Sequence, residues 1–153
     1  MDKLDEIDRK LLRRVQRDAD LGVEALGAEI GLSRNACWRR LKRLEEIGVI
    51  RRRVALLDAD ALGLGLTVFI AVRTDRHDAA WVEAFARATR GLPEIQGVYR
   101  TSGETDYLIR ARVADVKAYD ALYQRLIAKV DLKDVSASFV MEELKETTEL
   151  PVL

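Results

Sequence analysis

Apolar side chains recur with a helical period through the first third of the chain. Ile7, Leu11 and Val15 are spaced four residues apart, so they share one face of an amphipathic helix that we predict over residues 4–18. A second, shorter amphipathic stretch predicts another helix over residues 23–30. The two stretches indicate that the chain begins with helices.

A tight turn separates the second predicted helix from a third. Gly31 readily takes a positive φ and therefore ends the second helix, while Ser33 is a candidate N-cap for a third helix that we expect to end at Gly48. Two helices joined by a short turn containing glycine are typical of a helix-turn-helix, whose second helix can enter a groove of DNA. Residues 48–58 then predict a short, hairpin-like wing.

The rest of the chain follows a different pattern, in which apolar strands alternate with helical periods. In chain order the pattern predicts a strand at 66–73, a helix at 77–91, strands at 95–103 and 106–113, a helix at 115–130 and a strand at 134–144. The order β-α-β-β-α-β is that of a ferredoxin-like fold. The predicted fold class is therefore α+β, with an N-terminal winged helix-turn-helix joined to a C-terminal ferredoxin-like βαββαβ domain.

The two predicted domains meet near residues 58–65, where charge falls and glycine appears. We therefore divide the chain into residues 1–60 and residues 61–153. Helices cover one face of a ferredoxin-like sheet; the other face carries Leu108 and Val140, so we expect a second subunit to cover it. The helix positions predicted to face the sheet are Trp81, Val82, Phe85, Thr89, Val116, Tyr119, Leu122, Tyr123, Leu126 and Val130.

Charge is unevenly distributed along the chain, although the formal net charge is zero. Residues 1–53 contain 14 Lys/Arg against 10 Asp/Glu, whereas residues 54–153 contain 12 against 16. Residues 31–53 alone hold eight Lys/Arg in 23 positions. A local basic patch on an otherwise acidic chain is what a small module that contacts nucleic acid would show.

The outward faces of the third helix carry the candidate DNA contacts. Arginine can pair with guanine and asparagine with adenine, so base contacts are assigned to Arg34, Asn35, Trp38 and Arg39. Phosphate contacts are expected from Lys42, Arg43, Arg51 and Arg52. Ser33 is expected to cap the helix and to touch a phosphate, whereas Arg40 lies beside the packed face and could contact DNA or brace the helices. A solvated charged face is the ordinary interpretation of a basic helix, but the turn and the wing favour DNA binding.

The stretch TSGETDYL at residues 101–108 is the best candidate for a small-molecule site. Gly103 permits a tight turn between strands, and Glu104 and Asp106 could hold an α-ammonium group; a plain hairpin turn is the alternative. Two serines of the last strand alternate with apolar residues, so they should face away from the helices, either toward a small polar ligand or in close sheet packing. The complete candidate set is Thr101, Ser102, Gly103, Glu104, Thr105, Asp106, Tyr107, Ser136 and Ser138.

The sequence contains no recognisable catalytic or metal-ligating arrangement. Cys37 is the single cysteine and shares a face with Leu41 and Leu44, so a small buried hydrophobe is a better interpretation than a redox switch. His77, at a predicted helix start, favours a capping or solvated role. We therefore expect no enzyme, no cofactor and no metal. The lack of a long apolar run and of a signal-peptide core predicts a cytoplasmic protein with no membrane contact.

Several motifs, in this order and spacing, resemble those of the Lrp/AsnC (feast/famine) family of bacterial and archaeal transcription regulators. The resemblance rests on LDEIDRKLL, LGAEIGLSRNACWRRLKRLEEIGVI and a βαββαβ segment containing SGETDYLIRARV and VMEELK, and it covers essentially the whole chain. Within the family, the chain is most similar to the cysteine-responsive branch, which regulates cysteine detoxification. That similarity lies in CWRRLKRLE, VALLDADALGLGLTVF and ASFVMEELKETTELP.

The resemblance implies a regulator that binds a double-stranded DNA operator. It also implies a homodimer formed through the C-terminal sheets, with dimers assembling into octamers, and an amino-acid effector bound at or near the interfaces between those domains. The TSGETDYL hairpin then gains an effector role. L-cysteine is the first candidate effector, with leucine or another amino acid as the alternative.

Two rival functions remain open at the level of sequence. An architectural, nucleoid-type DNA binder without an effector would share the first domain. An acylphosphatase-like hydrolase would share the ferredoxin-like fold, but it needs an anion-cradling loop with a catalytic Arg/Asn pair near the first strand, and LGLGLTVFIAV has no such pair.

Overall fold

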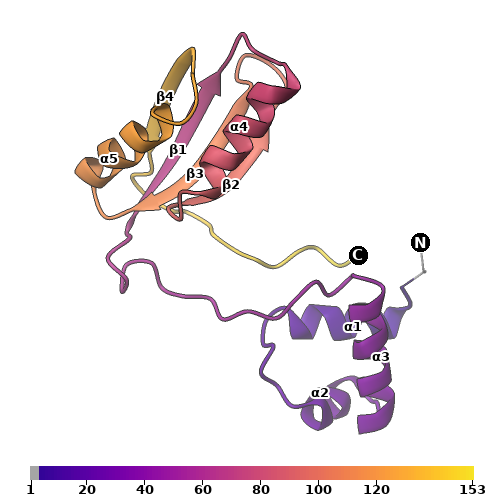
Figure 1. Cartoon of the computed structure of the whole chain (residues 1–153). Coiled ribbons are helices and arrows are strands. Elements are labelled where there is room, and N and C mark those ends of the chain that lie inside the picture. The colour runs from indigo at the N-terminus through magenta and orange to yellow at the C-terminus, as the bar shows by residue number, and fades with distance from the viewer. Residues whose placement is uncertain (1–3) are drawn as a thin grey trace. The chain divides into compact units, whose positions relative to one another are not determined.

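The protein, seen here in a computed structural model that describes residues 4–153, consists of two compact units. The first unit comprises Met1–Leu56 together with Lys145–Leu153, and the second comprises Leu57–Leu144 (Figure 1). The sequence-based division assigned residues 145–153 to the C-terminal domain. In the structure these nine residues make their contacts with the first unit.

The first unit contains three helices, α1 (Glu6–Val15), α2 (Val23–Ile30) and α3 (Arg34–Glu46). Helix α2 is the helix predicted over residues 23–30, and Gly31 ends it with a φ of 76°. Ser33 caps α3, as predicted, by accepting a hydrogen bond from the Ala36 N–H at 3.3 Å. A small core joins the three helices and consists of Leu11, Leu26, Cys37, Leu41 and Leu44.

Helix α1 is shorter than the predicted helix at residues 4–18. A capping box sets its start: the Asp5 carboxylate accepts a hydrogen bond from the Asp8 N–H at 2.7 Å, and the Asp8 carboxylate accepts one from the Asp5 N–H at 3.2 Å. At the other end the helix closes with Gln16 as its C-cap, and the N–H groups of Arg17 and Asp18 both bond to the Arg14 carbonyl. Side-chain caps at the first end and backbone bonds at the second therefore decide its length.

A glycine inside α2 allows the turn before α3 to pack closely. A Cβ on Gly27 would lie 2.8 Å from the Leu32 carbonyl oxygen and 3.3 Å from the Cys37 Cβ. The Leu32 N–H donates to the Gly27 carbonyl at 2.8 Å, so this approach is part of the turn itself. The close packing of α3 against α2 thus requires a residue without a side chain at position 27.

We predict that Gly27→Val lowers the free energy of unfolding of the first unit by about 2 kcal/mol, because a bulkier residue overpacks the turn. Urea denaturation of the variant and the wild type measures the difference. Gly22→Ala is the matched control, because a Cβ there has no atom within 4 Å and the φ of Gly22 is −59°. Equal midpoints for Gly27→Val and the wild type would show that the turn tolerates the side chain.

The hairpin-like wing predicted at residues 48–58 differs from the structure. The Ile50 N–H bonds back to the Leu44 carbonyl at 3.0 Å, and residues 51–58 form neither helix nor strand. The first unit has no strand among its described residues with which this segment could pair. Three consecutive arginines, Arg51–Arg53, also lack the alternation that would bury one side of a strand.

The second unit confirms the predicted β-α-β-β-α-β order. Its strands are β1 (Leu66–Arg73), β2 (Ile95–Arg100), β3 (Tyr107–Val113) and β4 (Asp134–Phe139), and its helices are α4 (Ala79–Arg90) and α5 (Val116–Ile127). The strands form one antiparallel sheet in the order β2-β3-β1-β4. Both helices lie on the same face of that sheet (Figure 1).

The core of the second unit lies between the sheet and the two helices. Alternate residues of β3 are buried, and Trp81, Phe85 and Tyr107 form an aromatic cluster with ring centroids 4.8–5.7 Å apart. Two predicted core positions are wrong: Val82 and Val116 are 39% and 58% exposed. Ala88 occupies the inward position of α4 instead, and Val116 is the first residue of α5, before the helix meets the sheet.

Strand β4 ends earlier than the predicted strand at 134–144. After Phe139 the Val140 N–H bonds to the Thr67 carbonyl at 3.0 Å, and the strand then stops. The Glu143 carboxylate accepts hydrogen bonds from the Thr67 hydroxyl and the Arg112 guanidinium, both at 2.9 Å. Side-chain bonds to the sheet therefore replace strand pairing in this segment.

The second face of the sheet carries no helix, as predicted. We call it the open face; it includes the half-buried Leu108 and Val140 and the more exposed Phe69 (37%) and Tyr99 (52%). Ser136 and Ser138, paired with Ala71 and Phe69 across β1, are exposed, while the alternating apolar residues of β4 pack on the core. Within residues 4–153, no helix is long and apolar enough to cross a membrane.

Candidate nucleic-acid interface and ligand site

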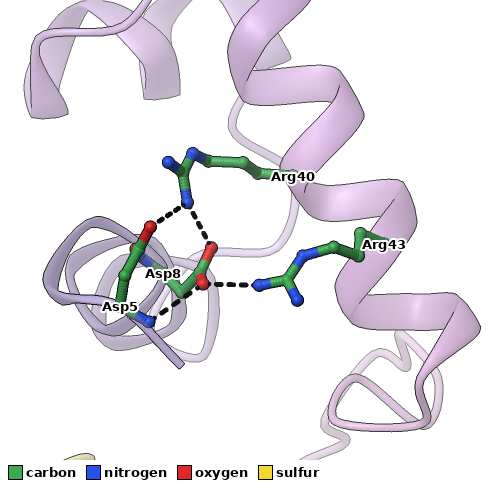
Figure 2. Close-up of polar contacts among 4 residues, drawn as sticks. All are labelled: Asp5, Asp8, Arg40 and Arg43. Atoms are coloured by element: carbon green, nitrogen blue, oxygen red, sulfur yellow. Dashed lines mark hydrogen bonds and ion pairs between the residues drawn. The ribbon is translucent and has the colours of Figure 1, made fainter. Parts of the chain in front are cut away.

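A buried carboxylate on α1 holds two arginines of α3. Asp8 is fully buried, and its two oxygens accept hydrogen bonds from Arg40 at 2.8 Å and from Arg43 at 2.7 Å (Figure 2). Arg40 also donates to Asp5 at 2.7 Å. The Asp8 backbone N–H, and then the Arg40 guanidinium, hold the pKa of Asp5 below its ordinary value. These four residues, which we call the α1–α3 clamp, fix the orientation of α3 against α1.

The clamp separates the basic residues of α3 into two groups. Arg40 and Arg43 are half-buried on the side that faces α1. The predicted base-contact residues and their neighbours are exposed on the remaining surface, and they are Ser33, Arg34, Asn35, Trp38, Arg39 and Lys42. We call these six residues the exposed basic face. Arg51 and Arg52, beyond the end of α3, are exposed as well.

The exposed basic face has the chemistry of a DNA-reading surface. Trp38 is 53% exposed, which is unusual for so large an apolar side chain, and the Lys42 Nζ lies 5.3 Å from its ring centroid. The first turn of α3 has no acidic residue, so the positive end of the helix dipole and Arg34 act together. An exposed guanidinium, amide and indole near one helix N-terminus can contact base edges, and Lys42 can contact phosphate.

Cys37 lies inside the core of the first unit, as predicted. It is fully buried, and burial raises the pKa of its thiol above the ordinary value. A buried, protonated thiol is a poor nucleophile and a poor metal ligand. Over the described part of the chain, no group of His, Cys, Asp and Glu could hold a metal ion.

The TSGETDYL stretch connects β2 to β3 by a closed turn. The Thr101 N–H bonds to the Asp106 carbonyl at 2.9 Å, the Thr101 hydroxyl donates to the Thr105 carbonyl, and Gly103 has a φ of 105°. Asp106 also has a structural partner, because one of its carboxylate oxygens accepts a hydrogen bond from the Thr74 N–H at 2.9 Å. The hairpin is thereby attached to the loop after β1.

Sequence reasoning missed one cation beside this hairpin. The Arg73 guanidinium at the end of β1 lies 3.5 Å from the Glu104 carboxylate and 4.0 Å from that of Asp134. It brings a guanidinium, a carboxylate and the Ser136 strand to one end of the sheet. The signal available in the sequence was its position as the last residue of the predicted strand 66–73.

The nine candidate ligand residues do not share one face of the sheet. Tyr107 is only 7% exposed, and its ring packs with Trp81 and Phe85 under the helices. Ser136 and Ser138 lie on the open face. The tyrosine side chain is therefore part of the core, whereas the hairpin turn, Arg73 and the serines are the groups that a ligand could reach.

Comparison with known proteins matches both units of the chain to domains of the same protein family. The AsnC-type helix-turn-helix domain model matches residues 4–45, and the Lrp/AsnC ligand binding domain model matches residues 67–150. The chain is 47% identical over 150 residues to the DNA-binding transcriptional activator DecR of Escherichia coli strain K12, with 97% of this chain and 99% of that protein covered. It is 46% identical to the Glutamate uptake regulatory protein of Zymomonas mobilis, with 98% and 92% covered.

The solved structures that resemble this chain are also transcriptional regulators. The crystal structure of an AsnC family transcriptional regulator from Agrobacterium tumefaciens has a TM-score of 0.94 and 49% identity, with 97% of each chain covered. The transcriptional regulator NMB0573 from Neisseria meningitidis, crystallised as a complex with L-Met, has a TM-score of 0.93 and 37% identity over the same shares. The relatives are transcriptional regulators and not enzymes.

Proposed function

The chain belongs to the Lrp/AsnC family of DNA-binding transcriptional regulators, and from this premise we propose that it reads a pseudo-palindromic operator as a dimer and responds to L-cysteine. The observation that carries the DNA-binding part is the separation of the basic residues of α3. The clamp holds Arg40 and Arg43 against α1, and the exposed basic face is left for DNA.

In this proposal each exposed residue has a role that follows from its chemistry. Base contacts come from Arg34, Asn35, Trp38 and Arg39, and phosphate contacts come from Lys42, Arg51, Arg52 and the Ser33 hydroxyl. Arg40 and Arg43 are assigned to bracing, because buried Asp8 already accepts a hydrogen bond from each. They position α3 and do not read DNA.

We predict that Arg39→Ala weakens binding to the best operator by about 1–3 kcal/mol and relaxes sequence preference at one position. Fluorescence anisotropy with a panel of single-substitution duplexes measures both effects. Lys42→Ala is the matched variant for phosphate contact: it should weaken binding to all duplexes alike and reduce the salt dependence. If Arg39→Ala weakens all duplexes equally, Arg39 contacts phosphate and not a base.

A second copy of the chain completes the proposed DNA-binding assembly. The open face exposes Phe69 and Tyr99 beside half-buried Leu108, which is an apolar surface suited to a second sheet. Two recognition helices in a two-fold dimer would meet half-sites about 34–36 Å apart, one turn of DNA. Further assembly of dimers into octamers is part of the proposal and would multiply the operator contacts. The proposal places the protein in the cytoplasm with its operator.

The proposed effector site lies at the end of the sheet where the β2–β3 hairpin meets Arg73. Glu104 and Asp106 offer carboxylates to an α-ammonium group, while Arg73 offers a guanidinium to an α-carboxylate. Ser136, exposed on the neighbouring strand, supplies a hydroxyl for a small polar side chain. L-cysteine is the first candidate because CWRRLKRLE, VALLDADALGLGLTVF and ASFVMEELKETTELP resemble the cysteine-responsive branch of the family. Leucine, or the methionine and glutamate that appear in the names of relatives, come second.

A thermal-shift panel of the purified protein against the twenty amino acids at millimolar concentration tests the effector. A ligand that binds only the native state stabilises it by about 2.7 kcal/mol at a hundredfold excess over its Kd. We expect a selective shift with L-cysteine. A selective shift with another amino acid would replace the effector in this proposal, and no shift with any would favour an architectural DNA binder.

We predict that Asp106→Asn removes the cysteine-induced thermal shift and leaves operator binding without effector unchanged. The amide oxygen of asparagine can still accept the Thr74 N–H, so the turn keeps its attachment, but the charge that would hold an ammonium group is lost. Glu83→Gln, at an exposed position of α4, is the control for a general loss of negative charge. A full shift in Asp106→Asn would remove Asp106 from the site.

A further inference from the structure

An extended segment at the end of the described chain is bound along α1. Gln16 makes two hydrogen bonds with the backbone of Leu150: its amide donates to the carbonyl at 2.9 Å, and its oxygen accepts from the N–H at 2.9 Å. Arg13 donates to the Val152 carbonyl at 3.0 Å, and Arg17 pairs with Glu149 at 2.9 Å. Residues 145–153 form neither helix nor strand, so these side chains of α1 hold the segment.

The contacts at this surface are polar at the rim and apolar beneath. The segment lies beside a hollow of about 330 Å³ whose lining includes Leu12, Val15, Ile50 and Val152. Val152 is half-buried, whereas Leu150 is 72% exposed. Most of the binding therefore comes from solvent-exposed hydrogen bonds, which open more readily than a buried core. The segment has the character of a reversible ligand of α1.

The chain just before this segment is attached to the other unit. Glu143 accepts hydrogen bonds from Arg112 and from the buried Thr67, both at 2.9 Å. Arg112 and Thr67 belong to β3 and β1, and their side chains lie on the open face. The chain therefore passes between the two units twice, at residues 56–57 and again at residues 144–145.

We propose that the outer surface of α1 is a binding site for residues 145–153, and that docking and release of this segment transmit the effector state from the second unit to the first. The inference rests on the proposed function, because it requires an effector that changes DNA affinity. An effector acts only through different affinities for two states. The docked and the released segment are those two states, and Gln16 and Arg17 decide the balance between them.

Charge reversal at the Arg17–Glu149 pair tests the inference in the full-length protein. Arg17 is 65% exposed and belongs to neither the exposed basic face nor the effector site, so Arg17→Glu should keep the fold and effector binding. We expect Arg17→Glu to increase hydrogen exchange at the Leu150 N–H and to abolish the effector-dependent change in operator affinity, while the thermal shift with L-cysteine persists. The double variant Arg17→Glu/Glu149→Arg should restore both the protection and the response.

Three results would overturn the inference. A wild-type Leu150 N–H that exchanges as fast as a free peptide would show that the segment is not docked. An unchanged effector response in Arg17→Glu, with protection lost, would show that docking carries no signal. A wild-type protein that shows neither a thermal shift nor a changed operator affinity with any amino acid would overturn the proposed function and this inference with it. The third result is distinguished from the other two because the effector response is then absent from the wild-type protein itself.

Discussion

Replacing Asp8 by alanine is expected to lower the free energy of unfolding of the first unit by about 3 kcal/mol and to abolish operator binding at the same time. The Asp8 carboxylate has no exposed surface and accepts hydrogen bonds from Arg40, Arg43 and the Asp5 N–H. Removing it takes an acidic partner from both guanidinium groups and opens a cavity between α1 and α3, although Arg40 keeps its bond to Asp5. The side chains of Arg40 and Arg43 are 29% and 37% exposed, so water can solvate them in part. The expected loss of stability is therefore at the lower end of the range for breaking a buried ion pair.

Urea titration, monitored through the backbone NMR signals of the first unit, measures the loss of unfolding free energy in that unit separately from the second. Glu6→Ala is the matched control. Glu6 is also an acid of α1 that pairs with an arginine, Arg13, but both side chains of this pair are exposed. That exposed pair should contribute less than about 1 kcal/mol. Equal losses in the two variants would mean that burial of Asp8 adds nothing and that the clamp does not orient α3.

The second large effect is expected from a charge on the open face. Phe69→Asp should convert the proposed dimer to a monomer and weaken operator binding on the order of a hundredfold, because a dimer interface would have to bury an unpaired carboxylate. The monomer should remain folded, since Phe69 is 37% exposed and lies opposite Arg110 across β1 and β3. Light scattering and anisotropy on the same samples measure assembly and binding.

Val82→Asp provides a closely matched control for that experiment. Val82 is 39% exposed, almost the same as Phe69, but it lies on α4 on the helix-covered side of the sheet. We expect Val82→Asp to remain dimeric and to bind the operator as the wild type does. A dimeric Phe69→Asp protein, or a monomeric Val82→Asp protein, would show that the open face is not the interface.

The periodicity of the sequence predicted most of the fold because burial follows periodicity in both units. Alternate positions of β3 are buried, and the apolar stripes of α1 to α3 meet in one small core. Errors arose where something other than periodicity decides an element. Strand β4 stops where Glu143 takes side-chain partners on the sheet, and Val116 lies too early in α5 to reach the core.

The candidate DNA interface could be predicted in part. The exposed basic face follows from the apolar stripe of α3, since the remaining positions must face outward. The sequence left bracing open as one role of Arg40, beside the packed face, but it assigned Arg43 to phosphate. The role of Arg43 could not be predicted, because its partner Asp8 is 35 residues away in the sequence. An acid at a capping position gives no signal that it also pairs with a distant helix.

The ligand site was predicted less completely. The turn at Gly103 and the exposed serines follow from local pattern, but Tyr107 belongs to the core, and Arg73 reaches the hairpin only because β1 pairs with β3. A contact between neighbouring strands depends on sheet order, which the sequence pattern alone does not specify. The attachment of residues 145–153 to α1 is likewise a contact between the two ends of the chain.

Selection of duplexes from a random DNA library by the purified protein, with and without L-cysteine, shows directly whether the protein is a sequence-specific regulator that responds to this amino acid. We expect enrichment of a pseudo-palindrome whose half-sites are about one helical turn apart. In the wild type, the Kd for that duplex should change when L-cysteine is added. The Asp8→Ala variant should not bind the duplex. Equal binding to all sequences, with no change in Kd on addition of any amino acid, would show instead that the protein is a non-specific DNA binder.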